Sequence, residues 1–93
     1  MKFLFLDCYD VKDNYRLYGN SRDWHRKNYK TLDECENMAK ADPRYIGWSY
    51  ADGWASKACY LMKKIRNKGQ DPDFISGMVK DKCKQKRGNT SID

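Results

Sequence analysis

The chain has 93 residues, the length of one small domain. It is 40% hydrophobic and 14% aromatic, a composition that excludes a disordered protein. A formal net charge of +6 favours a polyanionic partner, although a soluble protein without such a partner can be equally basic. No apolar run approaches the length of a membrane-spanning helix, so a transmembrane segment is not expected.

The first third of the chain is predicted to contain two short strands and a basic segment. The apolar run at residues 3–9 suits a buried strand, and residues 15–18 form a second strand after a turn at Asp13-Asn14. Residues 22–30 mix cations and aromatic rings without periodicity, which is typical of a loop or a sheet edge.

Residues 31–42 are predicted to form a helix, the best-defined element of the chain. Thr31 and Glu34 have the spacing of a capping box, in which each side chain bonds the other residue's backbone amide. Pro43 ends the helix because it disfavours the α conformation of the residue before it. One apolar stripe is formed by Leu32, Cys35, Met38 and Ala39.

The alternation of residues 45–51 predicts a strand that begins a hairpin. One face carries Ile46, Trp48 and Tyr50, and the other carries Gly47, Ser49 and Ala51. The small face would let the helix approach closely. Asp52-Gly53 signals a turn within a longer loop, and residues 58–62 return as the second strand.

The remainder of the chain is predicted to hold one more strand. Residues 63–72 read as a polar, basic connection, and residues 74–79 as the last strand. Gly77 within that strand indicates a bulge or a close contact. Residues 84–93 contain almost no apolar side chains, so we expect a flexible basic tail after a single domain at residues 1–83.

Four cysteines, at positions 8, 35, 59 and 83, are widely and nearly evenly spaced. This spacing favours two disulfides in a small secreted domain, and it matches no compact zinc site. Four cysteines allow three pairings, among which the spacing does not choose. The alternative is four reduced, buried thiols in a cytosolic protein.

Four stretches together resemble the PAN/apple domain family. They are Leu32-Asp33-Glu34-Cys35, Gly47-Trp48-Ser49-Tyr50, Ala58-Cys59-Tyr60-Leu61 and Ser76-Gly77-Met78-Val79. The resemblance covers about residues 8–83 and implies an α+β fold in which one helix packs on a curved antiparallel sheet. It also implies disulfides Cys35–Cys59 and Cys8–Cys83. The chain departs from the family at Ala39, where members commonly carry a second helix cysteine.

No catalytic or cofactor chemistry is expected from the sequence. His25 is the only histidine, and its nearby Ser21 and Asp23 are too common a grouping to indicate a triad. The glycines form no phosphate-binding loop, and the cysteine spacing predicts no metal site. We therefore expect a protein that is not an enzyme and holds no metal or cofactor.

The candidate ligand-binding residues are basic clusters and one aromatic side chain. They are Arg22, Arg26, Lys27 and Lys30 before the hairpin, Lys63, Lys64 and Arg66 after it, Lys80, Lys82 and Lys84 near the end, and Trp54, expected to be exposed beside the hairpin turn. A solvated, aggregation-resistant edge is the alternative explanation for any one cluster.

These observations predict a secreted, non-catalytic binding module whose partner is a protein or a carbohydrate. The PAN/apple resemblance implies this class of recognition, and the basic surface favours a sulfated glycosaminoglycan. Residues 1–6 are too short for the apolar part of a signal peptide, so a secreted chain has lost its signal. Two alternatives stay open: a nucleic-acid-binding basic protein, since residues 22–30 mix cations and rings, and a secreted effector or toxin on a disulfide scaffold.

Overall fold

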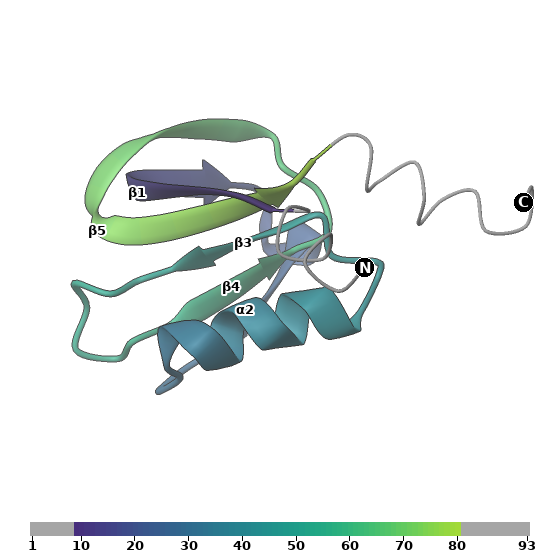
Figure 1. Ribbon diagram of the computed structural model, residues 1–93. Coiled ribbons are helices and arrows are strands. Elements are labelled where there is room, and N and C mark those ends of the chain that lie inside the picture. The colour runs from purple at the N-terminus through teal and green to yellow at the C-terminus, as the bar shows by residue number, and fades with distance from the viewer. Residues whose placement is uncertain (1–8, 81–93) are drawn as a thin grey trace, which may run out of the picture.

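The computed structural model describes residues 9–80, which form one antiparallel sheet with a helix on one face (Figure 1). The elements are β1 (Tyr9–Tyr18), the 3-10 helix η1 (Ser21–Asp23), β2 (Trp24–Lys27), α2 (Leu32–Ala41), β3 (Gly47–Tyr50), β4 (Cys59–Met62) and β5 (Asn67–Val79). The strand order is β1-β5-β3-β4-β2, and every neighbouring pair is antiparallel. The predicted α+β class is confirmed.

Part of the sequence prediction lies outside the described residues. Only Tyr9 of the strand expected at residues 3–9 falls inside them, where it begins β1. The expected tail at residues 84–93 lies outside, as do both members of the implied Cys8–Cys83 bridge. Neither described helix is long and apolar enough to cross a membrane.

The start of α2 is fixed by the predicted capping box. The Glu34 amide donates to Thr31 Oγ1 at 3.1 Å, and the Thr31 amide donates to Glu34 Oε1 at 2.8 Å. These two bonds satisfy backbone groups that the first helical turn leaves without intrahelical partners. The predicted stripe is also confirmed, because Cys35 and Ala39 are fully buried while Leu32 and Met38 pack at the margin of the core.

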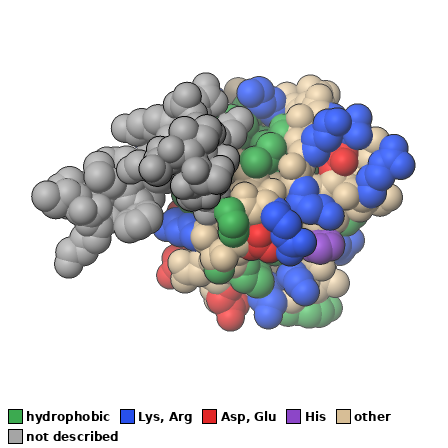
Figure 2. Space-filling view, turned by 90° about the vertical axis from the view of Figure 1, so that its right-hand side faces the viewer, with side chains coloured by type: hydrophobic (Ala, Val, Ile, Leu, Met, Phe, Trp, Pro, Cys, Tyr) green, Lys and Arg blue, Asp and Glu red, His purple; other side chains and the backbone are tan. Residues whose placement is uncertain are grey.

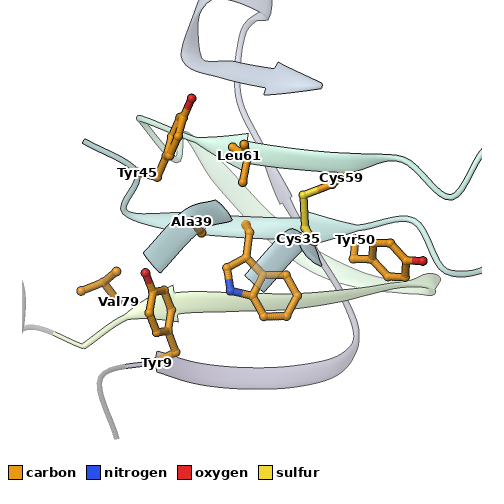
Figure 3. Close-up of a cluster of buried hydrophobic side chains, with 9 residues drawn as sticks. Tyr9, Cys35, Ala39, Tyr45, Tyr50, Cys59, Leu61 and Val79 are labelled. Atoms are coloured by element: carbon orange, nitrogen blue, oxygen red, sulfur yellow. A yellow bond between two sulfur atoms is a disulfide. The ribbon is translucent and has the colours of Figure 1, made fainter. Parts of the chain in front are cut away.

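The helix lies on the face of the sheet that carries Trp48 and Tyr50, which we call the helix face (Figure 3). The expectation that it approaches the small face, through Ser49, was wrong. Close approach is permitted instead by small side chains on the helix, Cys35 and Ala39, which leave room for the large rings.

A disulfide joins the helix to the sheet. It links Cys35 of α2 to Cys59 of β4, with 5.5 Å between their Cα atoms, and the other side chains of this core surround it (Figure 3). The Cys35–Cys59 pairing that the family resemblance implied is therefore confirmed. On the loop-closure model a bridge over 24 residues of sequence separation contributes about 3 kcal/mol to folding.

Gly77 makes the close contact that its place in the last strand predicted. It pairs with Trp48 across β5 and β3. A Cβ atom added at Gly77 would lie 2.6 Å from Trp48 Cε2, nearer than real Cβ atoms come to such a neighbour. The indole ring therefore occupies the space that any other residue at position 77 would need.

β1 and β5 form a long ribbon that bends back over the sheet (Figure 1). The turn expected at Asn14 is instead an irregularity inside one continuous strand, where Asn14 has φ 56° and the pairing jumps from Asp13–Ile75 to Tyr15–Gln70. Residues 63–72 were expected to be a connection, but β5 already begins at Asn67. Pairing with the second half of β1 supplies the hydrogen bonds that these polar residues need to be a strand.

The bent ribbon covers the second face of the sheet, which we call the ribbon face. A buried chain of hydrogen bonds attaches it: the Leu17 amide donates to Ser49 Oγ at 2.8 Å, and Ser76 Oγ donates to the Tyr15 carbonyl at 2.6 Å. The two hydroxyl oxygens are 2.5 Å apart, so the Ser49 hydroxyl is the donor to Ser76. The small side chains predicted on this face thus receive the ribbon, not the helix.

Candidate ligand-binding surface

Asp23 joins two basic segments that are far apart in the sequence. Its buried carboxylate accepts hydrogen bonds from Arg66 Nε at 2.6 Å and from the Asn20 amide at 2.8 Å. Its main-chain carbonyl accepts from the amides of Lys63 and Lys64 at 2.7 and 3.3 Å. The end of η1 is therefore held against the segment that follows β4.

The two segments that Asp23 joins carry four cationic residues, which we call the basic patch. Its members are Arg22, Lys63, Lys64 and Arg66, all of them exposed. The hydrogen bond from Arg66, and then that from the Asn20 amide, lower the pKa of the Asp23 carboxyl below its ordinary value. Figure 2 shows Lys and Arg side chains gathered on one side of the face that it draws, with the histidine among them.

A shallow hollow of about 330 Å³ adjoins the basic patch. It is lined by Ile46, Ile65, Arg66, Asn67, Lys68 and Met78. Arg66 belongs to both features, so the hollow and the patch are continuous. Three of the six lining side chains are apolar and three are polar, a composition that suits contact with an amphipathic ligand.

A second group of cations lies on the ribbon face, where two arginines cover aromatic rings. The Arg16 guanidinium is 5.4 Å from the centre of the Trp54 ring and 4.3 Å from that of Phe74. The Arg26 guanidinium is 5.8 Å from Trp54 and 5.5 Å from Tyr60. We call these five residues the arginine–aromatic cluster; such contacts hold planar guanidinium groups in fixed orientations.

The prediction that Trp54 is exposed was wrong. The ring is half-buried, because Phe74 and Tyr60 pack against it edge to face at 5.1 and 6.2 Å. Tyr29 is the most exposed large hydrophobic side chain among residues 9–80, with 78% of its surface exposed and φ 60°. It belongs to segment 22–30, whose mixture of cations and aromatic rings is visible in the sequence.

The other predicted residues are not part of the basic patch. Lys27 is exposed at the end of β2, and Lys80 is exposed after the end of β5. Lys30 is half-buried, and its carbonyl accepts a 2.6 Å hydrogen bond from the hydroxyl of the buried Tyr50. Lys82 and Lys84 lie outside the described residues.

His25 pairs with an aromatic hydroxyl instead of with a possible nucleophile. Its Nδ1 lies 2.7 Å from the hydroxyl oxygen of Tyr45. Between residues 9 and 80, no three His, Cys, Asp or Glu side chains converge in a way that could hold a metal ion. Arg16 was missed by sequence reasoning, because nothing in its neighbourhood of the chain indicates the rings that its guanidinium covers.

No protein-family model and no curated protein sequence matches this chain. The basic patch is the arrangement in which tertiary structure unites predicted residues from two separate segments, Arg22 from the first and Lys63, Lys64 and Arg66 from the second.

Proposed function

We propose that this chain is an extracellular, non-catalytic binding module of the PAN/apple type that recognises a sulfated glycosaminoglycan. The observation that carries the proposal is the basic patch organised by Asp23. Its carboxylate and carbonyl hold together two segments that carry four exposed cations. A sulfated chain carries repeated anionic groups, and such a surface can meet several of them at once.

The hydrogen bond from Asp23 also prepares Arg66 for binding. A free arginine side chain loses rotamer freedom when it binds an anion, and this loss opposes binding. Arg66 Nε is already held at 2.6 Å by Asp23, and the Arg66 amide donates to the Tyr18 carbonyl at 2.8 Å. Folding therefore already restricts the Arg66 side chain, so it loses less conformational entropy when an anion binds.

Two further observations support an extracellular module of this type. The buried Cys35–Cys59 bridge is the kind of bond that persists in oxidising compartments. A helix joined by a disulfide to an antiparallel sheet is the arrangement that the PAN/apple resemblance implies.

The basic patch favours a glycan over a single-stranded nucleic acid. Single-strand binders combine cations with open aromatic faces on which bases stack. The ring nearest to the patch in sequence, Trp24, is half-buried against Tyr60 at 4.8 Å, and its Nε1 donates to the Gly19 carbonyl. It therefore lacks the open face that stacking requires.

Heparin-affinity chromatography with a rising salt gradient tests the proposal. The protein should elute well above physiological ionic strength, about 0.15 M. Lys63→Gln/Lys64→Gln should elute markedly earlier, while the matched double variant Lys12→Gln/Lys57→Gln, with the same loss of charge outside the patch, should shift much less. Elution below physiological ionic strength, or equal shifts for the two variants, would contradict a specific glycan site.

Asp23→Asn separates an organised site from simple attraction between charges. The substitution raises the net charge by one, so unspecific attraction predicts later elution from heparin. Our proposal predicts earlier elution, because Arg66 loses its ionised hydrogen-bond partner. Thermal unfolding followed by circular dichroism checks that the variant is still folded at the temperature of the column.

A further inference from the structure

The outer edge of β2 has backbone groups without partners in the sheet. β2 is the last strand of the order β1-β5-β3-β4-β2. The Ile46 amide donates to the Met62 carbonyl, so Met62 directs its backbone groups toward β3. Because backbone direction alternates along a strand, Leu61 and Cys59 face β2, where they pair with His25 and Lys27.

Trp24 and Arg26 therefore direct their N–H and C=O groups away from β4. The same alternation explains why the Lys63 amide reaches the Asp23 carbonyl, one residue before Trp24. Among residues 9–80 no main-chain hydrogen bond from a loop or turn covers these groups. They form a short, open edge of the kind that accepts an added strand.

The side chain of Arg26 makes this edge selective. Its guanidinium lies over Trp54 and Tyr60, and its Nε donates to Asn28 Oδ1 at 2.8 Å. Within the described part of the chain no carboxylate forms an ion pair with Arg26. Its two terminal nitrogens are therefore left as donors for an anionic group.

We propose that β2 is the docking edge for an extended acidic peptide, which adds to the sheet beside Trp24 and Arg26 and sets an Asp or Glu side chain against the Arg26 guanidinium. Charge selects this occupant. A second copy of β2 would bring Arg26 and Lys27 against the same cations, and like charges on neighbouring strands are destabilising. This site uses backbone groups and Arg26, and it is separate from the basic patch.

The test uses a terminally blocked peptide of alternating Glu and Thr residues, long enough to span β2, and amide hydrogen exchange measured by NMR. In the free protein the His25 and Lys27 amides should be protected, and those of Trp24 and Arg26 should exchange fast. Saturating peptide should slow exchange at Trp24 and Arg26 by at least about tenfold, since both amides enter a new ladder.

Two matched comparisons identify the source of the affinity. The same peptide with every backbone amide N-methylated keeps its charge but cannot donate hydrogen bonds to a neighbouring strand, so it should lose most of its binding. Arg26→Gln should weaken binding of the unmodified peptide by about tenfold or more, the scale of a charged hydrogen bond. Lys27→Gln removes the same charge from β2 and should weaken binding less than about threefold.

Three outcomes would overturn the proposal. Equal binding of the N-methylated and unmodified peptides would show that the peptide binds by charge attraction alone. Equal losses of affinity for Arg26→Gln and Lys27→Gln would show that Arg26 makes no specific contact with the peptide. Protection of the Trp24 and Arg26 amides in the free protein would show that the edge is already covered. If that protection rose with protein concentration, the occupant would be a second copy.

Discussion

The two faces of the sheet are closed in different ways. On the helix face, the disulfide Cys35–Cys59 and the Trp48–Gly77 contact lie in an apolar core beneath α2. On the ribbon face, the cover is the bent β1–β5 ribbon, held by the hydroxyls of Ser49 and Ser76 and flanked by arginines on rings. The helix face is a scaffold, whereas Arg26 lies over rings of the ribbon face and the basic patch lies in segments that flank the strands.

The largest expected effect comes from removing the covalent link of the helix face. The double variant Cys35→Ala/Cys59→Ala should lose about 3 kcal/mol of unfolding free energy, because the unfolded chain regains the entropy of a long loop. Urea denaturation of variant and parent without reductant measures this loss. A difference below about 1 kcal/mol would show that packing alone closes the helix face, and the contrast between the two faces would then fail.

Gly77→Ala should have the next largest effect, about 2 kcal/mol of destabilisation, since its Cβ would lie 2.6 Å from the Trp48 ring. Gly69→Ala is the matched control on the same strand, where a Cβ meets nothing within 4 Å. It should change stability little or raise it slightly. In a Trp48→Leu background, Gly77→Ala should lower the free energy of unfolding by less. An unchanged loss of stability would show that the Trp48 ring is not the source of the strain.

Ser49→Ala tests the attachment of the ribbon. It leaves the buried Leu17 amide without its acceptor, which should cost about 1–2 kcal/mol and speed hydrogen exchange at Leu17. Ser56→Ala, in the β3–β4 loop, is a control whose side chain has no role in this attachment and should be nearly neutral. Unchanged exchange at Leu17 would mean that apolar packing alone holds the ribbon down.

The smallest expected effect is a pH dependence from Asp23. Its folded-state pKa is lowered, chiefly by Arg66, so its stabilising contribution is full above the ordinary carboxyl value near 4. That contribution is lost as pH falls through the lowered folded-state value. The stability gap between the parent and Asp23→Asn, followed by urea midpoints from pH 6 downward, should therefore narrow in acid. Arg66→Gln should flatten the dependence, and a gap independent of pH would contradict the ion pair.

Local patterns in the chain were sufficient for several elements. The capping box involves only Thr31 and Glu34. Because both lie within four consecutive positions, its hydrogen bonds could be predicted from the sequence. Alternation foresaw that Trp48 and Tyr50 share a face, and the place of Gly77 in an apolar strand foresaw its close contact. The partner of Cys35 came from the family resemblance, since spacing left three pairings open.

The arrangement of these elements depended on contacts between distant residues. A period of two separates the faces of β3 but does not say which face receives the helix, because that depends on side chains of both partners. The polar start of β5 is a strand only because β1 bends back at Asn14 to pair with it. In the same way, the sequence singled out Asp23 only as a neighbour of Ser21 and His25, and folding gave it Arg66 as a partner. Short-range periodicity thus sets each element, and long-range hydrogen bonds decide which surfaces they form together.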